Sequence, residues 1–194
     1  MTLTGRMNRK MIPANKFSLS IQTERLHVRE LRLNDVSFIV RLLNEPSFLK
    51  NIGDKGVRTE QDAELYIREA GFRKYSEFGF GMFLVEKRVD ATPIGICGLL
   101  QRDFLPNPDL GFAFLESAHG AGFGTEAARG VMSWATREVR LKKLSAFTSI
   151  SNAASIRVLL KNGFQTLGEK VLPGRVESSH VLEWVPNETE YTLN

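Results

Sequence analysis

A glycine-rich stretch in the second half of the chain has the residue types that bind phosphate groups. Residues 119–125 read HGAGFGT, between an apolar run at 110–115 and a helical pattern over 125–140. Glycines at alternate positions let the backbone turn sharply and approach a ligand closely. The first amides of a helix lack partners inside the helix and carry partial positive charge. The stretch therefore predicts a strand, a tight turn and a helix N-terminus that together bind a phosphate or pyrophosphate.

Two better-known phosphate-binding motifs do not match this stretch. A P-loop requires Lys followed by Ser or Thr after its last glycine, whereas Thr125 and Glu126 follow here. The dinucleotide fingerprint requires a different glycine spacing and an acidic residue at the end of the next strand. An ordinary glycine-rich turn remains the alternative, because a short glycine motif by itself is a weak signal.

A second polar motif lies downstream, at residues 151–164, and reads SNAASIRVLLKNGF. Together the two motifs resemble the GNAT acetyltransferase superfamily, in particular its RimJ/RimL-like branch of N-terminal acetyltransferases. The resemblance rests on HGAGFGTEA at 119–127, on Asn152 and Ser155, and on KNGF at 161–164. TERL at 23–26 and DLGF at 109–112 also fit, so the resemblance covers roughly residues 21–184.

The composition suits a soluble protein of one domain. The chain has 194 residues, of which 42% are hydrophobic and 25% charged. No apolar run is long enough to span a membrane, and no apolar segment follows the basic start as in a signal peptide. Cys97 is the only cysteine and lies in an apolar run, which predicts a buried thiol rather than a nucleophile. We therefore expect a cytoplasmic protein without membrane association.

The net charge of +4 comes from the start of the chain. Residues 1–16 contain no acid and four basic residues, which are Arg6, Arg9, Lys10 and Lys16. The other 22 basic residues balance the 22 acidic ones, so the folded part favours no specific nucleic acid binding. An RNA- or ribosome-associated role would depend on the arm. We expect a basic N-terminal arm (1–17), a single domain (18–187) and a C-terminal tail (188–194).

Hydrophobic periodicity and turn residues predict the order of the elements. Strands are expected at 19–33, 82–86, 94–101, 109–115, 143–150, 164–172 and 178–184. Helices are expected at 35–44, 59–77, 125–140 and 152–162. Asn34 is the expected first N-cap, residues 59–62 a capping box and Gly163 the last C-cap. Glu45 and Pro46 should end the first helix, with a loop at 48–56.

This order favours a mixed α/β layer. The resemblance implies more, namely the GNAT fold. That fold has a central, mostly antiparallel twisted sheet with one splayed pair of parallel strands, flanked by about four helices.

The resemblance also implies acetyl-CoA as co-substrate and no metal. Its pyrophosphate would contact the loop amides, its pantetheine arm would pair with the strand before the loop, and Asn152 would bond the pantetheine region. The residues implied to bind the cofactor are Phe112, Ala113, Phe114, Leu115, His119, Gly120, Ala121, Gly122, Phe123, Gly124, Thr125, Asn152 and Ser155.

Two of these residues, His119 and Asn152, have alternative interpretations. Family members often carry a basic residue and a Gln, Arg or Trp in the loop, where this chain has His119 and Ala121. Phosphate binding would then depend more on the backbone, with weaker affinity for the cofactor. His119 either contacts phosphate or is an exposed loop histidine. Asn152 is also a good helix N-cap, and this role is compatible with cofactor binding.

The implied reaction is direct attack of a primary amine on the acetyl thioester, which requires a group that accepts the proton of the amine. Asp109 stands where many relatives carry a carboxylate base, and Glu116 at the other end of the strand is the alternative. Each of the two is otherwise an ordinary surface carboxylate. Many relatives use a Tyr as the acid for the leaving thiolate, but Leu159 occupies that position here. Ser155 or a water would then act, or the thiolate would leave unassisted.

Substrate selection should come from the first two helices with the loop between them, 48–58, and from the last hairpin turn, 173–180, and these two segments carry charges of both signs. The acceptor is therefore left open between a protein N-terminus, which fits the branch, and a small amine, an amino acid or an aminoglycoside-like molecule. Two other questions also stay open: whether the chain forms a homodimer, and whether it is a CoA-binding sensor of the same fold without turnover.

Overall fold

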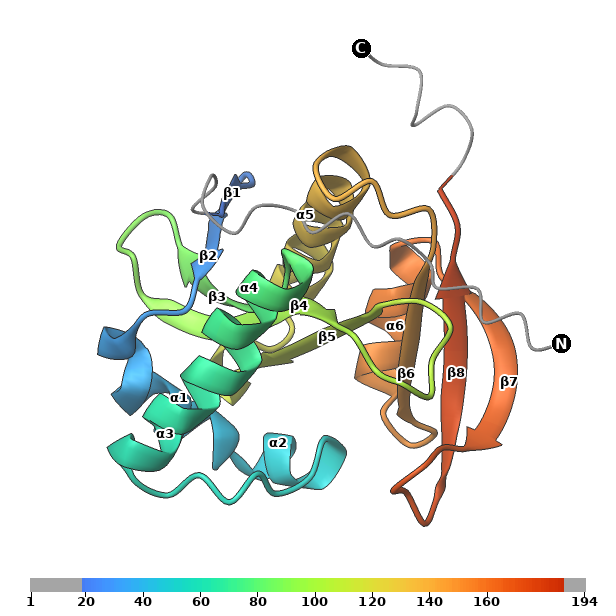
Figure 1. The fold of residues 1–194 in the computed structure, drawn as a ribbon, viewed down its shortest axis with the longest axis horizontal. Coiled ribbons are helices and arrows are strands. Elements are labelled where there is room, and N and C mark those ends of the chain that lie inside the picture. The colour runs from blue at the N-terminus through green and yellow to red at the C-terminus, as the bar shows by residue number, and fades with distance from the viewer. Residues whose placement is uncertain (1–18, 187–194) are drawn as a thin grey trace, which may run out of the picture.

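The computed structural model describes residues 19–186, so the predicted N-terminal arm and C-terminal tail lie outside the described residues. Eight strands form one sheet in the order β1-β2-β3-β4-β5-β6-β8-β7 (Figure 1). The strands are β1 Ser20–Gln22, β2 Leu26–Glu30, β3 Met82–Lys87, β4 Pro93–Leu100, β5 Asp109–Phe114, β6 Leu144–Ser149, β7 Gln165–Val171 and β8 Ser178–Trp184.

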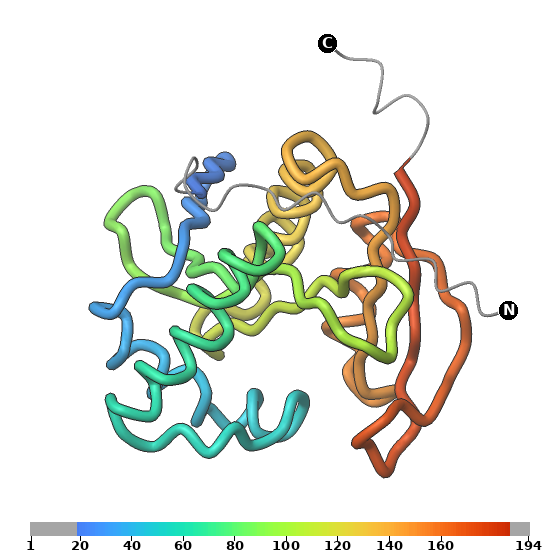
Figure 2. Tube along the Cα trace, viewed as in Figure 1, coloured from blue at the N-terminus to red at the C-terminus, as the bar shows by residue number. Residues whose placement is uncertain are grey.

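Helices cover both faces of this sheet. They are α1 Val36–Leu43, α2 Pro46–Asn51, α3 Glu60–Ile67, α4 Arg73–Phe78, α5 Phe123–Arg137 and α6 Ala153–Lys161. A π-helical turn, η2 (Arg68–Phe72), joins α3 to α4, so the Cα trace runs through all three as one rod (Figure 2). This rod lies in front of the sheet in Figure 1, and α5 lies behind it. No helix in residues 19–186 is long and apolar enough to cross a membrane.

The sheet of the described chain is antiparallel except where β5 meets β6. These two strands run parallel and share a single register pair, Asp109 with Ser145. In Figure 1, β3, β4 and β5 spread to the left while β6, β8 and β7 stand upright on the right. We call the gap in the hydrogen-bond ladder beyond Asp109 and Ser145 the open seam. It is the splayed parallel pair that the resemblance implied, and the mixed α/β fold is confirmed.

Each face of the sheet has its own hydrophobic core, because successive strand side chains point to opposite faces. Phe83 and Val85 of β3 lie in the core beneath α5 and α6. Met82 and Leu84 of the same strand lie in the core beneath α1, α2 and α3. The side chains on the two faces of β5 and β6 therefore lie in two different environments. Side chains on opposite faces can thus have different functions.

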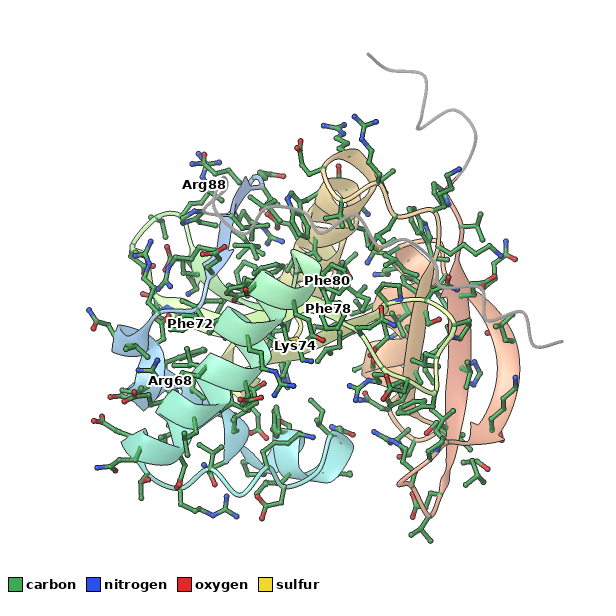
Figure 3. All side chains as sticks on the ribbon, viewed as in Figure 1. Arg68, Phe72, Lys74, Phe78, Phe80 and Arg88 are labelled. Carbon is green, nitrogen blue, oxygen red and sulfur yellow. The ribbon has the colours of Figure 1, made fainter. Side chains whose placement is uncertain are left out.

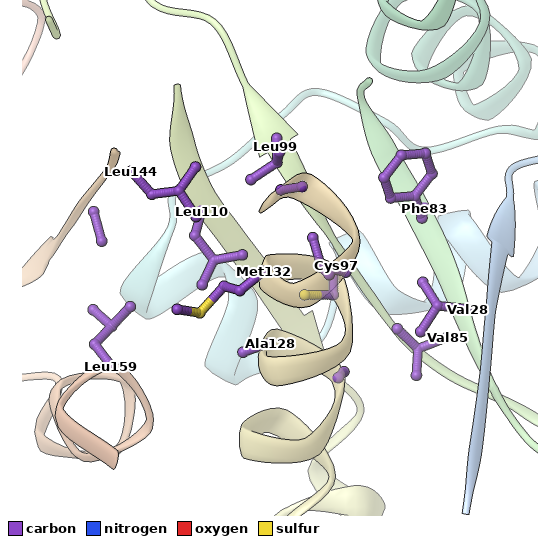
Figure 4. Packing of buried hydrophobic residues seen from close by; sticks show 14 of the residues in the cluster. Val28, Phe83, Val85, Cys97, Leu99, Leu110, Ala128, Met132, Leu144 and Leu159 are labelled. Carbon is purple, nitrogen blue, oxygen red and sulfur yellow. The ribbon is translucent and has the colours of Figure 1, made fainter. Parts of the chain in front are cut away.

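The core on the α5 side joins the two parts of the sheet across the open seam. Figure 4 shows Ala128 and Met132 of α5 near Leu110 of β5, Leu144 of β6 and Leu159 of α6. All five side chains are buried. Since β5 and β6 share almost no ladder, apolar packing rather than backbone hydrogen bonding holds the two parts together here.

The segment that follows the first predicted helix differs from the prediction. The expected loop at 48–56 contains most of α2, which begins at Pro46. A proline suits the first helical position, because its φ is preset and its missing N–H would be unpaired there. The structure therefore contains one helix, α2, that was not predicted. Pro46 is its first residue and also marks the end of the preceding helix.

The start of α1 also differs. Asn34 is not its N-cap, because a 3₁₀ turn, η1 (Leu33–Asp35), precedes the helix. The carboxylate of Asp35 accepts the N–H of Arg32 at 2.7 Å. The expected first strand is two strands, since a turn at Thr23 folds β1 back onto β2. The capping box at 59–62 is confirmed, with Thr59 accepting the N–H of Asp62.

Candidate active site

The glycine-rich loop joins the end of β5 to the start of α5. Gly120 and Gly122 have positive φ values of 78° and 83°, which residues with a Cβ rarely adopt. Gly122 is the N-cap of α5 and makes no side-chain cap hydrogen bond. The first amides of α5 are therefore left without a capping side chain, as a bound anion would require.

Gly124 has a different role from the other two glycines. It lies inside the first turn of α5 with ordinary helical backbone. A Cβ at this position would lie 3.5 Å from side-chain carbons of both Phe114 and Val158. The glycine thus lets the helix start lie close to β5 and α6, which narrows the space at the end of the open seam.

Backbone groups of β5 line the open seam. The N–H of Leu115 donates to Ile94 on β4, and the carbonyl of Pro108 accepts from Ser145 on β6, each at 2.9 Å. Because the groups of successive residues point to alternate edges of a strand, those of Phe112 and Phe114 point towards β6. The ladder with β6 has already ended there. These groups are therefore not paired with β6 and form a strand edge that an extended ligand can pair with.

His119 contacts this edge rather than standing free in the loop. Its Nε2 lies 3.0 Å from the carbonyl oxygen of Phe114. Since a carbonyl oxygen only accepts, Nε2 carries the proton in this arrangement. His119 is exposed, so a ligand that pairs with the Phe114 carbonyl can displace its ring.

An ion pair that the sequence did not predict braces the loop from the turn between β1 and β2. The carboxylate of Glu126, in the first turn of α5, accepts the hydroxyl of Thr23 at 2.6 Å and the N–H of Arg25 at 2.8 Å. The Arg25 guanidinium donates to the same carboxylate at 2.7 Å and to the carbonyl of Ala121 at 3.0 Å. It also stacks over the ring of Phe123 at 4.7 Å. The TERL stretch thus has a physical role, which is to fix the position of the loop.

The brace is expected to couple stability to cofactor binding. Partial burial raises the pKa of Glu126, but the hydrogen bonds from Thr23 and Arg25 outweigh it, so the pKa is lowered overall. Its stabilisation is therefore present at neutral pH and is lost as the pH falls through that lowered pKa. Glu126→Gln should cost about 1–2 kcal/mol of unfolding free energy and weaken acetyl-CoA binding.

A double-mutant cycle with Arg25→Gln measures this coupling by urea unfolding at pH 7. The losses of unfolding free energy in the two single variants should add up to about 1 kcal/mol more than the loss in the double variant, because the two residues share one interaction. Strict additivity would show that Arg25 and Glu126 stabilise the protein independently.

A shallow groove of about 500 Å³ lies beside the brace, lined in part by Arg25, Arg88 and Phe123. Figure 3 labels Arg88, which lies near the turn between β3 and β4. Its guanidinium donates to the carbonyl of Thr23 at 2.7 Å, while that of Arg25 is bound to Glu126. None of the residues that line the groove belongs to β5 or β6, so the groove is separate from the open seam.

Asn152 and Ser155 lie at the start of α6, across the open seam from β5. The Asn152 side chain accepts the N–H of Ser155 at 3.0 Å, which confirms its capping role. Both residues are half-buried. Binding of the pantetheine region by Asn152 stays a prediction.

Asp109 lies where β5 and β6 begin to part, and it is buried. Its Oδ1 accepts the Nε–H of Arg102 at 2.9 Å. Burial raises the pKa of Asp109 to about 6, even though Arg102 opposes this shift. A carboxylate with such a pKa is ionised at neutral pH and basic enough to accept a proton.

Glu116 lies in a different setting. It follows the far end of β5 in the 3₁₀ turn η3 (Glu116–Ala118) and is exposed. Its backbone N–H donates to the carboxylate of Glu45 at 3.0 Å. The structure therefore places the two candidate bases at opposite ends of β5, and only Asp109 lies at the closed end of the open seam.

The expected role of Cys97 is confirmed. The thiol is fully buried in β4, and burial raises its pKa. A buried thiol with a raised pKa is not a nucleophile at neutral pH.

The geometry defines a class of protein. A strand edge open over several residues leads to a loop whose amides suit a phosphate, and a basic carboxylate lies at the other end. This geometry suits an extended, phosphate-bearing ligand that lies between two strands with its far end near a carboxylate.

Comparison with known proteins gives the family. The model described as Acetyltransferase (GNAT) domain matches residues 25–165, which is well over half of the chain. The protein therefore belongs to the GNAT acetyltransferase family.

Individual relatives are more distant. The chain is 38% identical over 98 residues to the "Probable N-acetyltransferase YjcK" of Bacillus subtilis (strain 168), a match covering 49% of this chain and 52% of YjcK. It thus spans about half the length of that relative. It is 25% identical over 157 residues to the "Uncharacterized N-acetyltransferase YnaD" of the same organism, covering 80% and 89% of the two chains. Among solved structures, RimL, the ribosomal L7/L12 α-N-protein acetyltransferase, in complex with coenzyme A has a TM-score of 0.74 at 15% identity. That match covers 86% of this chain and 98% of RimL and shows the same fold.

Proposed function

We propose that the protein is an acetyl-CoA-dependent N-acetyltransferase of the RimJ/RimL-like branch that acts on a primary amine. A protein N-terminus is the first acceptor class to test, because RimL is a ribosomal-protein acetyltransferase of the same fold. The observation that carries the proposal is the open seam, whose free edge at Phe112 and Phe114 leads directly to the glycine loop.

The residues present fit acetyl-CoA. Amides from Gly120 to Thr125 would hold its pyrophosphate, and the edge of Phe112 and Phe114 would pair with its pantetheine arm. Asn152 would bond that arm from the opposite side of the seam while still capping α6. The bound molecule supplies an activated thioester, so the protein mainly has to position the acceptor and remove a proton.

Asp109 is the proposed base. The attacking amine forms a carbon–nitrogen bond as the carbon–sulfur bond breaks, and its proton must leave. Only 4% of the Asp109 side chain is exposed, so the proton would reach the carboxylate through one ordered water. Glu116 is less suited, because it lies at the phosphate end of β5. Ser155 is the proposed donor to the leaving sulfur, since it lies across the open seam on α6.

Thermal unfolding with and without acetyl-CoA tests the cofactor site first, with ADP and NAD as controls. At about a hundred times its Kd, acetyl-CoA should stabilise the protein by roughly 2.7 kcal/mol, and NAD should not. A panel of amine acceptors assayed for thiol release then tests turnover. A shift without turnover of any amine would favour a CoA-binding sensor, and the absence of a shift would remove the cofactor site altogether.

A further inference from the structure

Two arginines from separate loops stack on one aromatic ring, and a lysine from a third loop lies within range of their charges. The guanidinium of Arg102, in the β4–β5 loop, lies 5.1 Å from the centre of the Phe147 ring. The guanidinium of Arg175, in the β7–β8 turn, lies 4.9 Å from the centre of the same ring. Lys55, in the loop between α2 and α3, completes the group, and the charges of both arginines act on it. We call Lys55, Arg102 and Arg175 the basic cluster.

The positive charge of the basic cluster is only partly neutralised. Arg102 uses its Nε–H for Asp109, which leaves its terminal amino groups for another partner. Lys55 and Arg175 form no ion pair within residues 19–186. Lys55 is exposed, but desolvation of part of its side chain and, after that, the charges of Arg102 and Arg175 lower its pKa. Like charges held together in this way favour a bound anion.

Acidic side chains near Lys55 are already engaged. A hollow of about 270 Å³ beside it is lined by Asp62, Tyr66 and Glu69, among others. Asp62 accepts backbone N–H groups in the capping box of α3, and Glu69 pairs with Arg73 at 2.7 Å. Neither carboxylate is therefore committed to Lys55.

The basic cluster lies at the acceptor end of the proposed site. Phe147 follows Ser145 by two residues on β6, so its side chain points to the same face as those of Ser145 and Asp109. The glycine loop begins beyond the other end of β5, and a six-residue strand separates its ends by roughly 17 Å. An anion in the basic cluster is thus distinct from a phosphate bound at the loop.

We infer that the acceptor carries an anionic group, a carboxylate or a phosphate, which Lys55, Arg102 and Arg175 bind while its amine faces Asp109. Phe147 and Phe104, whose ring centres are 6.0 Å apart, form an apolar wall beside that group. This inference rests on the proposed acetyltransferase function and narrows its substrate class. Guanidinium groups suit the planar oxygens of a carboxylate or phosphate, and the surrounding rings reduce screening by water.

Matched acceptor pairs test the inference. β-Alanine is compared with β-alaninamide, phosphoethanolamine with ethanolamine, and a peptide beginning Ser-Asp-Glu with one beginning Ser-Asn-Gln. In at least one pair the anionic member should have a kcat/KM at least ten-fold higher than the neutral one. The pair that responds distinguishes a small-molecule acceptor from an acidic peptide terminus.

Two variants of the basic cluster connect this preference to the named residues. Lys55→Gln and Arg175→Gln should each lower the anionic-to-neutral ratio of kcat/KM by roughly ten-fold, the effect of losing one charged hydrogen bond. Arg137→Gln, at the exposed C-terminal end of α5, is the matched control and should leave the ratio unchanged. An unchanged thermal shift with acetyl-CoA shows that each variant is folded.

The outcomes distinguish a failure of this inference from a failure of the proposed acetyltransferase function on which it rests. Acetylation of neutral and anionic acceptors at equal rates, or equal ratios in Lys55→Gln, Arg175→Gln and the control, would overturn the inference and leave the acetyltransferase standing. Binding of acetyl-CoA without acetylation of any acceptor would overturn both.

Discussion

Replacing Asp109 with Asn should lower kcat by about 10²–10⁴-fold, while acetyl-CoA still binds. Asn has the same shape and can still accept the Nε–H of Arg102, but it cannot take a proton. Steady-state kinetics with a saturating acceptor measure kcat, and thermal unfolding with acetyl-CoA confirms that the cofactor site is intact.

The pH dependence distinguishes a base from a residue that only positions Arg102. Asp109 accepts a proton only when ionised, and its pKa is raised to about 6. In the wild type, kcat/KM should therefore rise with pH through about 6, before the acceptor amine itself titrates. In Asp109→Asn this step should disappear. If the variant retains the step, another group is the base and Asp109 acts by holding Arg102.

The same ionisation opposes folding. A carboxyl group whose pKa is raised in the folded protein stabilises it at low pH, and this contribution is lost as the pH rises through the folded-state pKa. A rise from 3.8 to about 6 corresponds to about 3 kcal/mol at pH 7. Asp109→Asn should therefore unfold at a higher temperature than the wild type at pH 7, with the difference vanishing near pH 4. Such a gain in stability with a loss of activity is typical of a catalytic group.

Replacing Gly122 with Val should weaken acetyl-CoA binding on the order of a hundred-fold. Gly122 has a φ of 83° at the N-cap of α5, where a β-branched side chain is strained by about 2–3 kcal/mol. Relaxation of that strain turns the loop amides away from the ligand, and each 1.4 kcal/mol corresponds to about a ten-fold loss of affinity. Isothermal titration with acetyl-CoA measures the change.

Gly168→Val is the matched control for this variant. Gly168 has a φ of 106° on β7, with no atom within 4 Å of an added Cβ, so the backbone strain is similar. This variant should lose stability without losing affinity for acetyl-CoA. Equal affinities in the two variants would mean that the loop backbone does not hold the ligand.

Local signals explain what was predictable from the sequence. The loop from His119 to Thr125 and the Asn152 cap follow from short-range patterns that the structure retains, whereas the parallel pair was implied by the resemblance to the GNAT superfamily. Glycine spacing reports backbone geometry directly, since few other residues adopt positive φ. The strand and helix order likewise follows from alternation along the chain.

Long-range pairings were not predictable in this way. Arg25 and Glu126 are 101 residues apart, and nothing in either local pattern indicates the other. The stacking of Arg102 and Arg175 on Phe147 depends on two loops, β4–β5 and β7–β8, whose conformations are set by tertiary packing. Arg102 was not among the predicted site residues, yet it pairs with Asp109, a residue predicted for its own chemistry.

The open seam leaves two strand edges facing each other inside one sheet. Unpaired edges normally attract other strands and lead to aggregation, and proteins protect them at the periphery with charges, prolines or bulges. Here the protection is geometric, because α5 and its core hold β5 and β6 in place while the two strands diverge. If both strands form before α5 docks, their unpaired edges are exposed to other chains. The order in which the strands form and α5 docks therefore affects how readily the folding chain aggregates in the cell.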